Sequence, residues 1–284
     1  MINGLILMHN IEHKNGISVV CPTYNSDNYI QRTINSLVDQ SIAADEIIFS
    51  DDGSDDKTIN ILKKNELKFT SSNTKLKILI NNHKGPGAAR NAGILNATYP
   101  WIAFLDSDDI WHKQKLEIVK KQINDFPEKN FFIHWEKYVR DRSNSSSLKH
   151  GIEYNKNFSL SKQLYKKNFF STSAVICKKS LLKKVGLFDT TLPNGQDYDL
   201  WLKLTPIIKL QIIPEFLGTY IEEKNSITAR PYYKRVISEV RIALRHKNKG
   251  GIKLFIIKLF KIVFSKQWIY SLFNLIFNQK KHNY

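Results

Sequence analysis

Short apolar runs alternate with amphipathic stretches over the first hundred residues of the chain. Four runs have the length and composition of buried β-strands, namely Ile17–Cys21, Glu46–Ser50, Lys75–Ile80 and Trp101–Leu105. Between them, apolar residues recur at helical spacing in Asn28–Gln40, Lys57–Lys68 and Gly87–Ala97. Strand and helix in alternation predict parallel strands joined by crossover helices on both sheet faces. The expected fold class is therefore α/β, with a mostly parallel, doubly wound sheet.

The pattern is less regular after residue 110. We expect a helix over Ile110–Val119, an exposed polar loop over Ser143–Ser147 and a strand over Phe169–Cys177. Two later stretches have helical character, Ser180–Val185 and Gln196–Leu204.

Acidic residues gather in the loops that follow the second and fourth predicted strands. They supply seven carboxylates: Asp51, Asp52, Asp55, Asp56, Asp106, Asp108 and Asp109. Because ligands of doubly wound sheets bind beyond the carboxyl ends of the strands, these side chains are expected on one rim. Such a rim is typical of a cation site.

Asp106 and Asp108 have the spacing of a metal clamp at a strand end. Carboxylate oxygens suit Mg²⁺ and Mn²⁺, and diphosphate oxygens of a substrate can complete the octahedron around either ion. The alternative is that these residues cap the helix predicted to begin at Ile110.

Two other loop segments suit a nucleotide. Asp52 can accept a hydrogen bond from a uracil N3–H, while Gly53 permits close backbone approach. Arg90 lies one turn inside a helix that starts at a glycine-rich segment, where it can face a diphosphate. The alternatives are a helix N-cap near Ser54 and a solvated surface arginine.

Asp197 and Asp199 open the predicted helix that also carries Trp201. A carboxylate at such a position can act as a general base on an acceptor hydroxyl. Helix capping is again the alternative.

In order along the chain, these segments resemble glycosyltransferase family 2. The similarity is carried by Ile17–Asn25 (ISVVCPTYN), Ile47–Asp56 (IIFSDDGSDD), Gly85–Ile94 (GPGAARNAGI), Trp101–Asp109 (WIAFLDSDD) and Gly186–Leu204 (GLFDTTLPNGQDYDLWLKL). The resemblance implies the GT-A fold and a single displacement that inverts the transferred sugar. It also implies a nucleotide-sugar donor, UDP-linked in the first instance.

The resemblance assigns roles to individual residues. The nucleotide-binding positions are Pro22, Thr23 and Tyr24 for the nucleoside, Asp52 for the uracil, Arg90 for the diphosphate and Asp106 for the ribose. Asp108 and Asp106 are assigned to bind the metal, Mn²⁺ or Mg²⁺, and Asp197 occupies the position of the general base. Gln196, which departs from the acidic residue common there in the family, is assigned to the acceptor pocket, and Trp201 is assigned either to that pocket or to the core.

Charge is distributed unevenly along the chain. The formal net charge is +17, and residues 231–284 hold twelve Lys or Arg against the single acid Glu239. Within this stretch, Ile252–Phe277 is rich in Ile, Leu and Phe, with a polar stripe of Gln267, Ser271, Asn274 and Asn278. A basic amphipathic helix of this kind suits an anionic membrane surface; packing on the catalytic domain or on a second copy is the alternative.

The chain thus divides into four parts. Residues 1–16 are read as a leader, 17–110 as the nucleotide-binding half and 111–225 as the acceptor-binding half of one GT-A domain, and 226–284 as a C-terminal helical tail. The two cysteines suggest neither a disulfide framework nor a zinc site. We expect a cytoplasmic enzyme, peripheral on the inner face of the cell membrane, that acts on a saccharide or lipid-linked acceptor in cell-surface polysaccharide biosynthesis.

Three other functions compete with this interpretation. A nucleic-acid-binding protein would explain the basic tail, but the acidic rim repels phosphate unless a metal intervenes, so no nucleic acid is expected. A nucleotidyltransferase would need a glycine-rich, basic triphosphate loop early in the chain, which Pro22–Asp27 does not provide. A non-catalytic member of the same fold would not need Asp106, Asp108 and Asp197 together.

Overall fold

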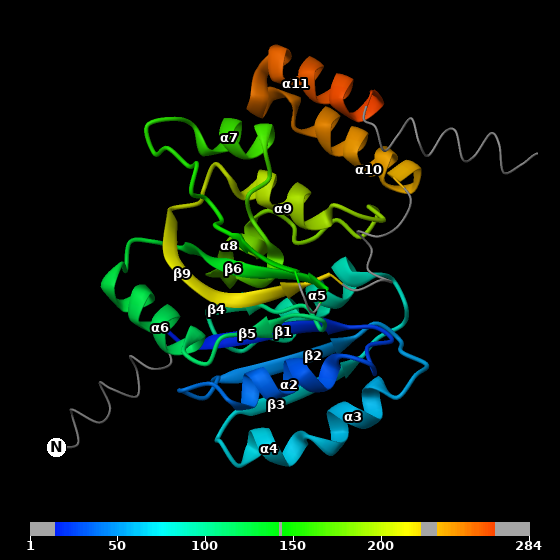
Figure 1. Ribbon diagram of the computed structural model, residues 1–284, viewed down its shortest axis with the longest axis vertical. Coiled ribbons are helices and arrows are strands. Elements are labelled where there is room, and N and C mark those ends of the chain that lie inside the picture. Colours follow the sequence, from blue (N-terminus) through cyan, green and yellow to red (C-terminus); the bar gives the residue numbers. More distant parts are fainter. Residues whose placement is uncertain (1–14, 142–143, 223–231, 265–284) are drawn as a thin grey trace, which may run out of the picture.

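The computed structural model of the protein describes residues 15–141, 144–222 and 232–264 (Figure 1). Within these residues the strands form one nine-stranded sheet in the order β3-β2-β1-β4-β8-β6-β9-β5, with β7 paired to β6 outside this path. The strands are β1 Ile17–Thr23, β2 Glu46–Asp51, β3 Lys75–Ile80, β4 Trp101–Phe104, β5 Ile110–Trp111, β6 Phe131–Asp141, β7 Asn144–Leu148, β8 Val175–Lys178 and β9 Leu210–Ile221.

Helices cover both faces of this sheet (Figure 1). They are α2 Ile30–Val38, α3 Thr58–Lys64, α4 Glu66–Thr70, α5 Pro86–Asn96, α6 Lys115–Asp125, α7 Leu160–Lys166, the 3-10 turn η1 Thr172–Ala174, α8 Lys179–Lys184, α9 Gln196–Leu204, α10 Tyr232–Arg245 and α11 Lys247–Val263.

The first half of the sheet is parallel, as the alternating pattern predicts. β3, β2, β1 and β4 all run in the same direction. Side chains alternate across β1, so that Val19 belongs to a core formed with α2, α3 and α6, while Val20 belongs to a second core formed with α5, α8 and α9. The expected α/β fold with a doubly wound sheet is therefore confirmed.

The second half of the sheet is mixed. β8 is antiparallel to both of its neighbours, β4 and β6, whereas β9 is parallel to β6 and antiparallel to β5. Two consecutive antiparallel pairings return β6 to the direction of β4. The carboxyl ends of β1, β2, β4, β6 and β9 consequently lie along one edge, which is the rim expected to bind a ligand.

Three local predictions in this half are wrong. Ile110 and Trp111 form β5 with β9, and helix α6 begins only at Lys115, because strand pairing and the Trp111 N–H bond to Ser36 Oγ outweigh local helical spacing. Residues 144–148 form a strand paired with β6 where a loop was expected. The predicted strand Phe169–Cys177 includes the turn η1, and only its last part enters the sheet.

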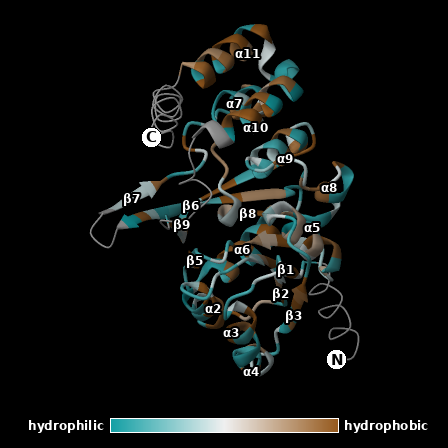
Figure 2. Cartoon of the chain, turned by 90° about the vertical axis from the view of Figure 1, so that its right-hand side faces the viewer, coloured by the Kyte–Doolittle hydropathy of each residue, from teal (hydrophilic) through white to brown (hydrophobic). Residues whose placement is uncertain are grey.

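The C-terminal helices lie at the end of the molecule opposite α4 (Figures 1 and 2). The helix expected from Ile252 is present up to Val263, after a break at Gly251, where φ is 75°. Its predicted polar stripe lies outside the described residues, as does most of the predicted leader. Among the described residues, no helix is both long and apolar enough to cross a bilayer.

Candidate active site

The loop after β4 presents Asp106 and Asp108 at the rim. Helix α2 fixes its backbone, since Arg32 Nη2 donates to the Asp108 carbonyl at 2.8 Å and Thr33 Oγ1 donates to the Ser107 and Asp109 carbonyls at 2.8 Å each. Both carboxylates are partly exposed. Because α6 starts at Lys115, capping of that helix does not explain Asp106 or Asp108.

Arg90 joins helix α5 to this loop. Its Nη2 lies 2.6 Å from Asp106 Oδ1, and its guanidinium lies 5.6 Å from the centre of the Phe188 ring. Only 11% of the Arg90 side chain is exposed, which rejects the alternative of a solvated surface arginine. Although burial lowers the pKa of Arg90, the charges of Asp106, Asp197 and Asp108 raise it above its usual value. The guanidinium therefore stays charged among three carboxylates.

Asp197 enters the same cluster from helix α9. The turn before the helix depends on Gly195, whose φ of 69° strains any residue with a side chain. Burial raises the pKa of the Asp197 carboxyl, while the Arg90 charge and the amides of its own turn oppose this shift. A partly buried carboxylate with a raised pKa beside an arginine is typical of a functional site.

Gln196 faces helix α5 rather than an open pocket. A Cβ on Gly87 would lie 2.5 Å from Gln196 Oε1, and the amide of Gln196 donates to the Leu192 carbonyl. The side chain is buried. Gln196 thus packs the amino-terminal ends of α5 and α9 together, which brings Arg90 and Asp197 to one place.

Trp201 is a core residue. None of its surface is exposed, and its ring packs edge-on against the four phenylalanines Phe104, Phe131, Phe170 and Phe188. Of the two assignments open for this residue, the complete burial of its ring supports the core.

The β1 and β2 ends form a second group of predicted residues. Pro22 and Thr23 are buried in β1, and Thr23 Oγ1 donates to Asp51 Oδ2 at 2.8 Å. Asp51 also accepts from the Gly53 and Ser54 amides, at 3.0 and 2.8 Å. Helix α3 begins later, at Thr58. Ser54 is therefore not its N-cap, and Asp51 is a structural residue of this turn.

Asp52 connects the end of β2 to the loop between β3 and α5. Its carboxylate accepts from the Lys84 and Gly85 amides at 2.9 and 2.8 Å and lies 2.8 Å from His83 Nδ1. The His83 ring stacks on Tyr24, with ring centres 4.3 Å apart. The predicted nucleoside residues Tyr24 and Asp52 are thus brought together by His83, a residue that the sequence interpretation missed.

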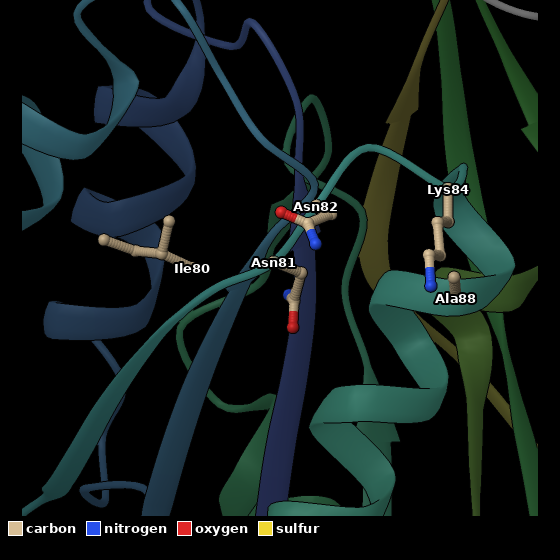
Figure 3. Close-up of a pocket in the computed structure, with 5 residues that line it drawn as sticks. All are labelled: Ile80, Asn81, Asn82, Lys84 and Ala88. Carbon is tan, nitrogen blue, oxygen red and sulfur yellow. The ribbon is translucent and has the colours of Figure 1, made fainter.

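An open groove of about 370 Å³ lies beside this loop and the start of α5 (Figure 3). It is lined by Ile80, Asn81, Asn82, Lys84 and Ala88. None of the predicted site residues lines it. The groove adjoins the nucleoside group through Lys84, whose backbone amide binds Asp52.

Asp109 points away from the rim, unlike its neighbours in the acidic loop. It is 1% exposed, and it accepts from Ser173 Oγ at 2.5 Å and from the Ile221 amide at 3.0 Å. Ser173 Oγ in turn accepts from the Asp106 amide at 3.0 Å. Burial, and after it the charge of Asp108, raises the pKa of Asp109 well above its usual value. Ser173, which no local signal reveals, thus joins the loop to η1.

The donor atoms fit a divalent cation that a substrate helps to bind. Among the described residues, no three His, Cys, Asp or Glu side chains converge into a complete protein site. Asp106 and Asp108 instead offer carboxylate oxygens at an open rim, which is how Mg²⁺ and Mn²⁺ are commonly held beside phosphates.

Comparison with known sequences identifies the family. The sequence model described as "Glycosyl transferase family 2" matches residues 18–186, which includes the acidic loop, Arg90 and Ser173. A relative from Escherichia coli, "UDP-Glc:alpha-D-GlcNAc-diphosphoundecaprenol beta-1,3-glucosyltransferase WfgD", is 32% identical over 193 residues, covering 66% of this chain and 69% of WfgD.

Other relatives are longer than the matched region. An "Uncharacterized glycosyltransferase" of Rickettsia typhi is 29% identical over 206 residues, which cover 71% of this chain and 62% of that protein. A second, from Rickettsia conorii, is 30% identical over 196 residues, covering 66% of this chain and only 30% of the relative. The chain therefore spans about three fifths or less of these proteins.

Solved structures show the same fold. Staphylococcus aureus TarS 1-349 in complex with UDP-GlcNAc has a TM-score of 0.69 at 21% identity, covering 90% of this chain and 79% of that one. The mannosyltransferase PcManGT from Pyrobaculum calidifontis, in complex with GDP-Man and Mn²⁺, has a TM-score of 0.63 at 17% identity, covering 92% and 74%. With its GT-A fold and its match over more than half its length, the chain belongs to glycosyl transferase family 2.

Proposed function

We propose that this protein transfers a sugar from a UDP-linked donor to a saccharide or lipid-linked acceptor in cell-surface polysaccharide biosynthesis, with inversion and with a divalent metal. The observation that carries the proposal is the convergence of Arg90, Asp106 and Asp197 at one rim of the sheet. These residues come from three elements and provide a diphosphate-binding cation, a metal-binding carboxylate and a base.

The donor would lie along the carboxyl ends of β1, β2 and β4. Tyr24 would contact the nucleobase and Asp52 would accept its N3–H, while Asp106 would meet the ribose. A UDP donor is favoured because WfgD is named for a UDP-sugar and TarS binds UDP-GlcNAc in its complex. The GDP-mannose in the PcManGT complex makes GDP the second nucleotide to test.

The reaction needs a base on one side of the sugar and charge neutralisation on the other. Asp197 would accept the proton of the acceptor hydroxyl as that oxygen bonds to the anomeric carbon and the carbon–diphosphate bond breaks. Arg90, now paired with Asp106, would donate to the departing diphosphate. A bound Mn²⁺ or Mg²⁺ at Asp106 and Asp108 supplies Lewis-acid stabilisation of the same charge.

Calorimetric titration with UDP, GDP and dTDP, each with and without Mn²⁺, tests the donor site. We expect UDP to bind best and only in the presence of Mn²⁺. In Asp108→Ala, UDP should bind weakly, and the addition of Mn²⁺ should not increase its affinity. Asp55→Ala is the matched control, because Asp55 is an exposed carboxylate of the neighbouring acidic loop with no assigned role. Absence of binding by any of the three nucleotides would refute the assignment of the rim to a nucleotide-sugar.

The C-terminal helices support peripheral attachment to the inner face of the cell membrane. Helix α11 exposes large apolar side chains at helical spacing, namely Ile252, Ile256, Phe260 and Val263, and the C-cap residue Phe264 is exposed beside them. Lys253 and Lys261 are exposed on the same helix. An apolar surface with adjacent lysines suits the headgroup region of an anionic bilayer.

Flotation with vesicles of phosphatidylglycerol, compared with phosphatidylcholine, tests this attachment. The double variant Ile256→Glu/Phe260→Glu should lose binding to the anionic vesicles. Leu67→Glu is the control, because Leu67 is 81% exposed on α4, at the opposite end of the molecule (Figure 1). Equal flotation of the double variant and the wild type would refute membrane docking by α11.

A further inference from the structure

Helix α9 carries two carboxylates with different surroundings. Asp197 lies in the electrostatic environment of Arg90 and Asp106 at the rim. Asp199, two residues later, projects from another side of the helix, because successive residues are rotated by about 100°. This side faces the junction between α10 and α11 (Figure 1). The proposed function uses Asp197 and leaves Asp199 without a role.

Asp199 is completely buried among three cationic or potentially cationic side chains. Its Oδ1 accepts from Arg245 Nη1 at 2.9 Å and from His246 Nε2 at 2.8 Å, and its Oδ2 lies 2.8 Å from Lys203 Nζ. Lys203 belongs to α9 itself, whereas Arg245 ends α10 and His246 precedes α11. The buried carboxylate therefore ties the C-terminal helices to the helix that carries the proposed base.

Helix α10 also contacts the turn that leads into α9. Arg245 Nη1 lies 2.8 Å from Asp189 Oδ2, so one guanidinium bridges the preceding loop and the helix. A Cβ on Gly195 would lie 2.9 Å from Ile242 Cδ1, which shows how closely α10 covers this turn. Helix α10 therefore packs against the segment 189–199, which includes the turn before α9 and the first residues of that helix.

Helix α11 adds a contact to the residue directly after the base. Lys258 Nζ donates to the Tyr198 hydroxyl at 2.8 Å and to the Tyr165 carbonyl at 3.0 Å. Both residues that follow Asp197 are therefore bound by side chains of the C-terminal helices. Such contacts fix the rotation and position of the first turn of α9.

We propose that α10 and α11 form a positioning element of the active site, and that Asp199 is the positioning residue through which they set the orientation of Asp197. This inference rests on the proposed function for its catalytic consequence. Removing one cation from a buried carboxylate weakens the contacts that hold it in place, and small displacements of a catalytic group reduce rates strongly. Loss of the Asp199 contacts should thus slow the transfer step while the donor site at β1 and β2 stays intact.

The test changes the C-terminal side of the contact and leaves α9 unaltered. In the full chain, Arg245→Met should lower kcat about 10-fold or more and leave the Kd of UDP within about 2-fold of the wild type. Arg245→Lys, which keeps a cation, should recover most of the lost kcat. Arg241→Met is the matched control, because Arg241 is exposed one turn earlier on α10, and it should behave as the wild type.

Hydrogen–deuterium exchange separates this inference from the proposed function. In Arg245→Met, amides of residues 195–200 should exchange faster, while amides of β1, β2 and β4 keep wild-type protection and so demonstrate an intact fold. Unchanged exchange over residues 195–200, or equal losses of kcat and UDP affinity, would overturn the positioning role. If the wild type transfers no sugar from any donor, the proposed function fails, and the exchange data alone decide whether α10 and α11 position α9.

Discussion

The two halves of the sheet are built by different means. In residues 17–110, parallel strands and their crossover helices follow one another along the chain, and the rim residues lie in the loops between them. In residues 111–222, β6 pairs with the distant strand β9, and helix α9, which carries the proposed base, contacts α10 through Asp199 and Arg245, 46 positions apart. The residues of the rim can therefore be recognised from short stretches of sequence. The position of Asp197, by contrast, depends on contacts with residues far away in the chain.

The largest expected effect is on the rate of sugar transfer, through the proposed base in the second half of the sheet. Asp197→Asn removes the proposed base and keeps the side-chain shape, so kcat should fall by about 10²–10⁴-fold while UDP affinity stays near the wild-type value. Initial rates with a UDP-sugar and calorimetry measure the two quantities. A loss of UDP binding as large as the loss of kcat would place Asp197 in the donor site. The donor site would then not be confined to the first half of the sheet.

Trp201→Ala should be the most destabilising single change. The ring fills the core between β4, β6 and α9, and truncation of a buried Trp typically costs about 3–5 kcal/mol. Urea unfolding monitored by far-UV circular dichroism measures the loss in the free energy of unfolding. Stability within about 0.5 kcal/mol of the wild type, together with a raised KM for acceptor, would instead assign Trp201 to the acceptor pocket.

Acid should weaken the attachment of the C-terminal helices through Asp199. Burial alone would raise its pKa, but hydrogen bonds from His246 and Lys203 and the charges of Lys203 and Arg245 hold the pKa of Asp199 at about 2. Its ordinary value in an unfolded chain is about 3.9. Because the folded pKa is the lower one, the stabilisation is present above about pH 4 and is lost as the pH falls towards about 2.

This difference amounts to about 2–3 kcal/mol of the free energy of unfolding. Urea unfolding between pH 5 and pH 2 should show it, with Asp199→Asn less stable than the wild type at pH 5 and less dependent on pH across this range. Parallel pH dependences of the two proteins would show that Asp199 is not the titrating group.

The smallest effect should come from the nucleoside group of the first half. Tyr24→Ala removes a half-exposed ring that stacks on His83, so folding stability should hardly change. The Kd of UDP should rise about 10-fold, since stacking of a base on an aromatic side chain contributes about 1–3 kcal/mol. Calorimetry at constant Mn²⁺ measures this change. An unaltered Kd would mean that the nucleobase does not contact Tyr24.

The rim could be predicted because its signals are local. Each strand of the first half is a short apolar run, and parallel strands necessarily bring their carboxyl ends to one edge. Asp52, Asp106 and Asp108 directly follow such runs, so their common location follows from the pattern alone. The family motifs added the chemistry of a nucleotide-sugar, which the family match supports.

Which of the seven acidic residues face a ligand was not predictable. Asp51 and Asp109 are buried acceptors that hold the loops. Asp106 and Asp108 remain partly exposed. The spacing of these aspartates does not distinguish buried from exposed carboxylates. The burial of each one depends on backbone amides and hydroxyls that come near it only when the loops fold.

By itself, the sequence determined the α/β order, the rim and the candidate chemistry, since these depend on periodicity and on residues that adjoin strand ends. Tertiary structure alone decided that Trp201 is core, that Ile110 and Trp111 pair with β9, and that Asp199 meets Arg245 and His246. Those contacts join residues 46 to more than 100 positions apart. No local pattern encodes them, because burial and strand pairing are properties of the packed chain.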